Sequence, residues 1–276
     1  MRGRGSPAYS VDDKKCLRSI SAALRPPAPS NRPVAVVLAA GLGSRLQSVQ
    51  SARPKGFVEI GGKPIIARSV EAVRRAGVSE FVFVVGWRRE IYREWCAREC
   101  AGAVCVENPE YATTGSLRSL LLGAAAVPER DLIVLESDLL YEQRAPDLLL
   151  SAADMDTVLI SGFTQSRDEV WAYESAPNRL GHLTKQRAAV GEPVGELVGL
   201  TRMSASLIRD LGTAARAMAA TAHYEDGLNA VAAARAVTLL PVPDLAWCEI
   251  DDPAHLTRAR DVVWPRIVTA DTAWNF

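Results

Sequence analysis

The stretch Val34-Ala-Val-Val-Leu-Ala-Ala-Gly-Leu-Gly-Ser-Arg-Leu46 decides the fold of this chain. Residues 34–38 form a short apolar run between Pro33 and a glycine-rich turn, a pattern typical of a buried strand. The small residues that follow let the backbone approach a ligand, and successive N–H groups there can bind a polyphosphate. Arg45 adds a fixed positive fork for phosphate oxygens. The stretch therefore predicts a phosphate-binding loop at the end of the first strand of an α/β sheet.

Two better-known phosphate motifs are excluded by the residues present. The loop is not a P-loop, because no Gly-Lys-Ser/Thr follows it, and the third glycine of the dinucleotide-binding fingerprint is missing. Pro54-Lys55 follows Arg45 by about ten residues, so a lysine can add a second positive charge at the loop. The loop and Lys55 together are a more specific signal than the glycines alone.

Apolar strands and amphipathic helices alternate in the first half of the core. The expected strands are 34–38, 81–85, 104–106 and 132–135, followed by 157–160, 169–174, 180–184, 194–203 and 236–240. The expected helices are 65–76, 88–100, 116–126 (with Ser116 as N-cap), 204–220, 226–234 and 253–263. Short connections between the later strands indicate antiparallel additions. The pattern predicts a Rossmann-like three-layer α/β/α sandwich with a mixed, mainly parallel sheet.

A single domain over residues 33–264 is expected from the length of the chain. Residues 1–32, rich in Arg, Ser, Pro and Ala, indicate a flexible N-terminal extension, and residues 265–276 a C-terminal tail.

The charge balance excludes several kinds of partner. Lys plus Arg number 32 and Asp plus Glu number 32, so the net charge is zero and does not favour nucleic acid or anionic membranes. No apolar run reaches the roughly 18 residues of a membrane span, and the N-terminus lacks the apolar segment of a signal peptide. Five cysteines without regular spacing do not indicate a disulfide framework. We expect a cytoplasmic protein, with a homodimer as one option for its assembly.

Asp138 follows the expected buried strand 132–135. A carboxylate at this position lies at the same sheet edge as the phosphate loop. Magnesium prefers one or two carboxylates together with phosphate oxygens and water. We therefore expect Asp138 to bind Mg²⁺, with Glu136 supporting the site from behind.

The segment after strand 104–106 carries polar groups that could recognise a base edge and a ribose. Its candidate nucleotide-binding residues are Asn108, Thr113, Thr114, Gly115 and Ser116. The other interpretation, equally supported by the residues, is simply a well-capped helix start.

These motifs resemble those of the nucleotidyltransferase superfamily, and in particular its small cytidylyltransferases. The resemblance is carried by residues 38–55, Asn108-Pro-x-Tyr111, and the strings 136–142, 168–170, 198–200 and 247–252. The resemblance covers about residues 33–264. This branch includes enzymes acting on phosphocholine, 2-aminoethylphosphonate and related phosphonates. The resemblance implies a nucleotide-diphospho-sugar transferase-like fold and transfer of CMP from CTP to a small phosphonate, with release of pyrophosphate, in phosphonate natural-product or phosphonolipid biosynthesis.

The resemblance also implies roles for individual residues. The loop residues Leu38, Ala39, Ala40, Gly41, Gly43 and Ser44 would wrap the triphosphate. Arg45 would hold the leaving pyrophosphate, and Lys55 would neutralise charge that grows on the α-phosphate. Asp251 would complete the Mg²⁺ site with Asp138. Asp252 and Glu249 stay open as alternatives, although Asp252 before Pro253 is also a natural helix N-cap.

The acceptor pocket is the least determined part of this interpretation. Its candidate residues are Arg118, Glu169, Trp171, Lys185, Glu196, Tyr224 and Asp226. Trp171 could instead pack in the core, Lys185 could be an exposed strand lysine, and Asp226 could cap a helix. Arg118 stands where relatives carry an aromatic or neutral residue, which favours an anionic acceptor such as phosphonoformate unless it faces solvent or CTP.

Two other functions remain as alternatives. A sugar-1-phosphate or phosphocholine nucleotidyltransferase would use the same loop and carboxylates. A non-catalytic nucleotide-binding regulator is disfavoured, because both Lys55 and Asp138 are present.

Overall fold

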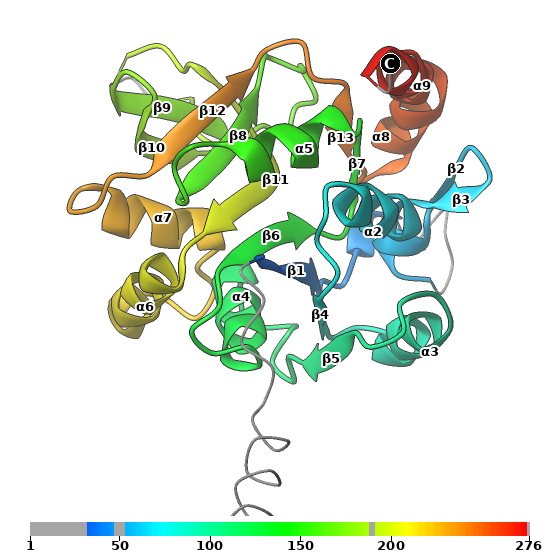
Figure 1. Ribbon diagram of the computed structural model, residues 1–276, viewed down its shortest axis with the longest axis horizontal. Helices are drawn as coiled ribbons and strands as arrows, with labels where there is room; N and C mark the ends of the chain where they lie inside the picture. Colours follow the sequence, from blue (N-terminus) through cyan, green and yellow to red (C-terminus); the bar gives the residue numbers. More distant parts are fainter. Residues whose placement is uncertain (1–31, 47–52, 188–190, 275–276) are drawn as a thin grey trace, which may run out of the picture. The chain divides into compact units, whose positions relative to one another are not determined.

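The computed structural model describes residues 32–46, 53–187 and 191–274 (Figure 1). Within these ranges the main sheet has nine strands. In spatial order they are β5 (Val104–Glu107), β4 (Phe81–Val85), β1 (Val34–Ala39), β6 (Leu132–Glu136), β11 (Gly195–Met203), β8 (Thr157–Ser161), β12 (Thr238–Val242), β10 (Arg179–Thr184) and β9 (Trp171–Ala176). Strands β5, β4, β1 and β6 run parallel, whereas β11 is antiparallel to both β6 and β8. The predicted antiparallel additions are confirmed.

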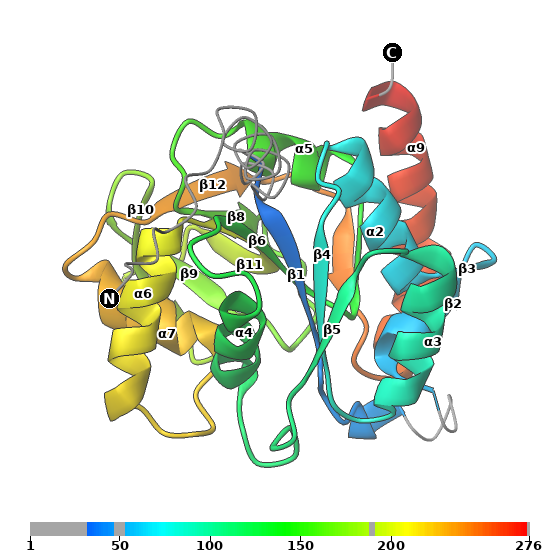
Figure 2. The same cartoon turned by 60° about the horizontal axis from the view of Figure 1, so that its bottom comes forward.

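Helices cover both faces of the main sheet (Figures 1 and 2). One face packs against α2 (Ile65–Arg75), α3 (Arg89–Glu99) and α5 (Arg144–Ser151); the other packs against α4 (Ser116–Ala125), α6 (Ala205–Ala214) and α7 (Tyr224–Ala232). Alternate residues of each strand serve the two faces: in β1, Ala35 and Val37 join the first core and Val34 and Val36 the second. The predicted three-layer α/β/α sandwich is therefore confirmed.

Strand β11 joins two parts of the sheet. Its residues Leu200–Met203 pair with β6, whereas Gly195 and Glu196 pair with β9. The pairing of β11 with β8 shifts in register between Leu197 and Thr201, which is where β11 passes from the segment paired with β9 to the segment paired with β6. Because β9 returns to β11, the strands β11, β8, β12, β10 and β9 form a closed circuit of pairings. We call these five strands the ring.

A third, smaller core lies beside the carboxyl end of β6. Strands β7 (Leu139–Tyr141) and β13 (Trp247–Glu249) pair there, and α8 (Pro253–Arg258), the π-helical turn η4 (Ala259–Val263) and α9 (Trp264–Trp274) follow. Ile267 of α9 is buried in this core. Residues 265–274, which the sequence alone assigns to a tail, are thus helical.

The remaining elements are short. They are the 3₁₀ turns η1 (Ser44–Leu46), η2 (Lys55–Phe57) and η3 (Ala215–Ala217) and the hairpin strands β2 (Glu59–Ile60) and β3 (Lys63–Pro64).

Some helix starts differ from the expectation. Gly115, not Ser116, is the N-cap of α4, because the Ser116 hydroxyl instead accepts a hydrogen bond from the Tyr224 N–H at 3.0 Å. Helix α7 begins at Tyr224 rather than 226, because His223 and Asp226 form a capping box. No helix in the described ranges is long and apolar enough to span a membrane.

Candidate active site

A cleft of about 310 Å³ opens beyond the carboxyl ends of β1 and β6, the edge of the sheet where the sequence places the phosphate loop. Its floor includes Leu38, Ala39 and Ala40 of β1 and its turn, Glu136 at the end of β6, and Asp138 just after it. The ring supplies the opposite wall. This size suits a small-molecule ligand rather than a macromolecule.

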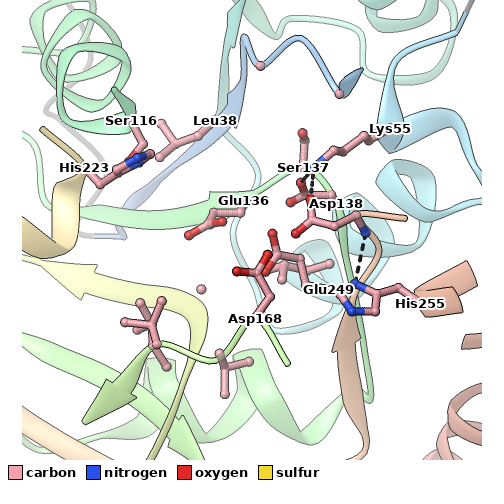
Figure 3. Close-up of a pocket in the computed structure, with 18 of the residues that line it drawn as sticks. Leu38, Lys55, Ser116, Glu136, Ser137, Asp138, Asp168, His223, Glu249 and His255 are labelled. Carbon is pink, nitrogen blue, oxygen red and sulfur yellow. Dashed lines mark hydrogen bonds and ion pairs between the residues drawn. The ribbon is translucent and has the colours of Figure 1, made fainter. Parts of the chain in front are cut away.

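Three charged side chains, Lys55, Asp138 and Asp251, meet in the cleft although they are far apart in the sequence (Figure 3 labels Lys55 and Asp138). The Lys55 Nζ atom lies 3.1 Å from Asp138 Oδ2 and also contacts Asp251 Oδ1. Pro54, in extended conformation, directs the chain into η2 and so presents Lys55. The Ile250 N–H donates to the Asp138 carbonyl at 3.0 Å, which fixes the turn bearing Asp251 beside the turn bearing Asp138.

Arg45 reaches the same carboxylates from the phosphate loop. Its Nη2 lies 2.9 Å from Asp251 Oδ2, and its Nη1 lies 2.9 Å from Asp168 Oδ2. The Asp251 side chain is 1% exposed, whereas the Arg45 side chain is 54% exposed. The guanidinium of Arg45 is therefore already solvated and can move away from Asp251 at little cost to itself. Lys185 also lies 2.7 Å from Asp168 Oδ1.

The electrostatics of the cleft follow from this crowding. Burial alone would lower the pKa of Lys55, but Asp138 and Asp251 outweigh it and raise that pKa, so the ammonium stays charged. Burial would raise the pKa of Asp251, but hydrogen bonding by Glu249 and the charge of Lys55 lower it. Burial, with Asp138 as a like charge, raises the pKa of Glu136 to about 8 and that of Glu249 well above its ordinary value. Such an excess of carboxylates favours the binding of a cation.

Two sets of three carboxylates have oxygens within 4.8 Å of one another. They are Glu136, Asp138 and Glu249, and Asp168, Glu249 and Asp251. The Asp138 Oδ1 atom is buried and accepts no hydrogen bond within the described part of the chain. An oxygen-only donor set with a free buried carboxylate oxygen fits a hard divalent cation. Asp252 is turned elsewhere, since its carboxylate accepts from the His255 N–H at 2.8 Å and caps α8 as expected.

The phosphate loop is shaped by its glycines. At Gly41 a Cβ atom would meet no described atom within 4 Å, so the backbone is open to a ligand on that side. Gly43 has φ +58°, and a Cβ there would lie 3.0 Å from the Lys55 Cγ atom. The glycine thus lets the stem of Lys55 cross the loop. Ser44 lies in η1 at the end of this loop.

Thr114, Gly115 and Ser116 line the end of the cleft near Leu38 (Figure 3 labels Leu38 and Ser116). Gly115 is required there, because a Cβ would lie 2.1 Å from the Ala222 carbonyl oxygen. Ser116 also contacts His223 Nδ1 at 3.2 Å, and His223 lines the cleft too.

Two other residues of the same segment do not line the cleft. Asn108 is 1% exposed and donates to Thr114 Oγ1 and Ser119 Oγ at 3.1 Å each, so it supports the segment from beneath. Thr113 donates to the Glu110 carbonyl.

Of the candidate acceptor residues, Glu169, Lys185 and Glu196 line the cleft. Arg118 does not: it is exposed and its Nη2 lies 3.5 Å from Glu110 Oε2. Trp171 lies against the Phe163 ring, with centroids 5.5 Å apart.

The two candidates from the start of α7 also lie away from the lining. Tyr224 is fully buried in the second core, and Asp226 caps the helix by accepting from the His223 N–H at 2.8 Å.

Several lining residues carry no recognisable signal in the sequence. They include Tyr92, His223, His255 and Arg258. His223 and His255 each occupy the first turn or cap of a helix, which a search for nucleophile or zinc motifs does not detect. The cap positions, where side chains turn back toward a loop, would have been the only hint.

The family model that describes the MobA-like NTP transferase domain matches residues 35–226. The chain belongs to this family. The MobA-like match includes the phosphate loop, Lys55 and Asp138, and it ends before Asp251.

Two curated relatives of this chain are named as enzymes that act on phosphonates. The chain is 33% identical over 240 residues to a CMP-5'-(3-aminopropyl)phosphonate synthase of Streptomyces rubellomurinus, a match covering 82% of this chain and 38% of the relative. It is 30% identical over 107 residues to a 2-aminoethylphosphonate cytidylyltransferase of Lancefieldella rimae, covering 38% and 42% of the two chains. The chain thus spans less than half the length of these two relatives. The predicted resemblance to small cytidylyltransferases is confirmed.

Solved structures agree on the fold. The inositol-1-phosphate CTP transferase from T. maritima superposes with a TM-score of 0.74 at 20% identity, covering 87% of this chain and 96% of that one. The predicted nucleotide-diphospho-sugar transferase-like fold is confirmed by this match.

Proposed function

We propose that the protein is a Mg²⁺-dependent cytidylyltransferase that transfers CMP from CTP to a small aminoalkylphosphonate and releases pyrophosphate. The observation that carries the proposal is the convergence of Lys55, Asp138 and Asp251 beside the phosphate loop. The names of the two relatives, which concern 3-aminopropylphosphonate and 2-aminoethylphosphonate, support the choice of acceptor.

The cleft offers what transfer of a nucleotidyl group needs. Such a reaction depends on positioning and charge stabilisation, with little covalent work for the protein. Arg45 would leave Asp168 and Asp251 to hold the β- and γ-phosphates, and Lys55 would neutralise charge on the α-phosphate. Asp138 and Asp251 would hold the Mg²⁺, with Glu249 as the carboxylate common to both sets; bound Mg²⁺ neutralises triphosphate charge. A phosphonate is already anionic near neutral pH, so its attack on the α-phosphorus needs no general base.

The carboxylates of the cleft favour an acceptor with a positive group. Glu169 and Glu225 both line the cleft, and neither of them ion-pairs with Lys or Arg among the described residues. An ammonium on the acceptor would offset their charge. The argument for a carboxylated acceptor such as phosphonoformate rested on Arg118, which lies outside the lining and beside Glu110. We therefore prefer the aminoalkyl acceptor.

A panel of substrates tests the proposal. The purified protein would be incubated with CTP and Mg²⁺ and one of 2-aminoethylphosphonate, 3-aminopropylphosphonate, phosphonoformate, phosphocholine or glucose-1-phosphate. Pyrophosphate release and ³¹P NMR of the product would be recorded, with UTP and GTP in place of CTP as controls. We expect CTP-specific turnover with an aminoalkylphosphonate. Turnover of glucose-1-phosphate, with none of the phosphonates used, would refute the proposal and favour a sugar-1-phosphate nucleotidyltransferase.

A further inference from the structure

The loop between β8 and β9, residues 162–170, is held by residues from two other elements. Glu196 of β11 is 1% exposed and accepts from the Thr164 N–H and hydroxyl, each at 2.7 Å. From α8, Arg258 donates to the Thr164 carbonyl at 3.0 Å. His255, also in α8, lies with its Nε2 3.1 Å from the Ser166 carbonyl oxygen. We call residues 162–170 the acceptor-side loop.

His255 makes a second contact in the opposite direction. The Asp251 N–H donates to His255 Nδ1 at 3.4 Å, a long hydrogen bond (Figure 3). Because a backbone N–H can only donate, Nδ1 accepts, and the ring proton is on Nε2, where it is donated to Ser166. His255 is 8% exposed, so few other positions are open to the ring. One imidazole thus joins the acceptor-side loop to the turn that presents Asp251.

The far end of the acceptor-side loop faces the catalytic residues. Its Asp168 lies between Arg45 of the phosphate loop and Lys185, which follows β10, at 2.9 Å and 2.7 Å. Glu169 and Val170 also line the cleft. The contacts that hold the acceptor-side loop against α8 therefore determine where Asp168, Glu169 and Val170 lie relative to Arg45.

We propose that His255 is a positioning residue that seats the acceptor-side loop against α8 and so fixes the binding site of the acceptor. The proposal rests on the proposed function, since it assigns that loop to the acceptor rather than to CTP. His255 acts through the Ser166 carbonyl, and through the Asp251 backbone to a smaller degree.

Two conservative variants separate the two contacts of His255. The amide of Gln reaches the place of Nε2 and can still donate to Ser166, whereas the amide of Asn reaches only the place of Nδ1. We expect His255→Ala and His255→Asn to raise the acceptor KM roughly threefold to tenfold, the effect of one lost hydrogen bond. His255→Gln should restore the acceptor KM to near that of the wild type. The KM for CTP should change less than about twofold in all three.

The matched control is Thr257→Ala, an exposed residue of the same helix whose hydroxyl bonds only to the Pro253 carbonyl among the described groups. It should leave both KM values unchanged. Equal impairment of the Asn and Gln variants, or a KM for CTP that rises as much as the acceptor KM, would overturn the proposal.

Hydrogen exchange followed by mass spectrometry tests the seat of the loop without any turnover. In the substrate-free protein, amides of residues 162–170 should exchange faster in His255→Ala than in the wild type or Thr257→Ala. Unchanged exchange would overturn the positioning role. If the wild type uses no phosphonate while the exchange result holds, the proposed function fails and the seating of the loop stands.

Discussion

Replacing Lys55 with methionine separates two roles that one ammonium plays. Its Nζ lies 3.1 Å from Asp138 Oδ2 and contacts Asp251, and the side chain is 18% exposed. Methionine keeps an unbranched, largely buried side chain but removes the charge. In the free protein the charge neutralises carboxylates; during turnover it would neutralise phosphate. The two roles predict opposite effects of the Lys55→Met variant on metal binding and on catalysis.

The magnitudes follow from the environment of the ammonium. A preorganised donor aimed at developing charge is worth about 3–4 kcal/mol, so kcat should fall about 10²- to 10³-fold. The same ammonium competes with a cation for the oxygens of Asp138 and Asp251. Removing a competing ion pair worth about 1 kcal/mol should tighten Mg²⁺ binding about fivefold. The metal-free variant should also lose thermal stability, because the buried Asp251 carboxylate loses the ammonium of Lys55. Among the described residues only the largely exposed Arg45 is then left as its basic partner.

The assay combines pyrophosphate release with calorimetric titration of Mg²⁺ in the absence of nucleotide. Lys63→Met is the matched control, since the Lys63 side chain is 41% exposed and pairs with Glu71 at 2.7 Å on the surface. It should change neither kcat nor metal affinity. Near-normal turnover of Lys55→Met, or metal binding weaker than in the wild type, would refute the reasoning.

Three further outcomes are expected. Asp138→Asn should lower kcat by about 10³-fold while far-UV circular dichroism stays unchanged, and activity within tenfold of the wild type would argue against a metal role. Gly199→Ala should lower the free energy of unfolding, measured in urea, by about 2–4 kcal/mol, because φ is +87° and a Cβ would lie 2.8 Å from a Leu139 methyl. Its control is Gly62→Ala, where φ is +74° and the space is open, and which should lower that free energy by about 1 kcal/mol. The pKa of Glu142 is raised by burial, although Arg144 opposes the shift, so the native state binds more protons than the unfolded state above pH ~4.5 and stability falls as pH rises there. Glu142→Gln should flatten that fall in Tm between pH 5 and 7, and an unchanged slope would contradict it.

The fold was predictable because its signals are local. The apolar run of β1, the glycines after it and the alternation with helices each depend on neighbouring residues. The phosphate loop and Asp138 reach one cleft because parallel strands present their carboxyl ends at one edge. The ring was only partly predictable. Gly199, a glycine inside β11 with φ +87°, is a signal for the register shift, but the return of β9 to β11 depends on tertiary contacts.

The acceptor side could not be predicted residue by residue. Arg118 lies in the first turn of α4, but the direction of its side chain depends on Glu110, which comes from the preceding loop. Tyr224 had a polar hydroxyl and a helix start in its favour, yet its ring fills the core beneath α7. His255 gave no motif, because Ser166, the partner of its Nε2, is distant in the sequence and only Asp251 is a near neighbour. Contacts of this kind are set by tertiary packing.

The double membership of strand β11 has a consequence for how such enzymes diversify. One half of the strand extends the sheet whose edge carries the phosphate loop and Asp138, and the other half belongs to the ring. Insertions or substitutions in the loops of the ring can therefore remodel the choice of acceptor while the hydrogen-bond ladder to β6 stays intact. On the proposed function, evolution can thus vary the acceptor with little disturbance to the site of the nucleotide.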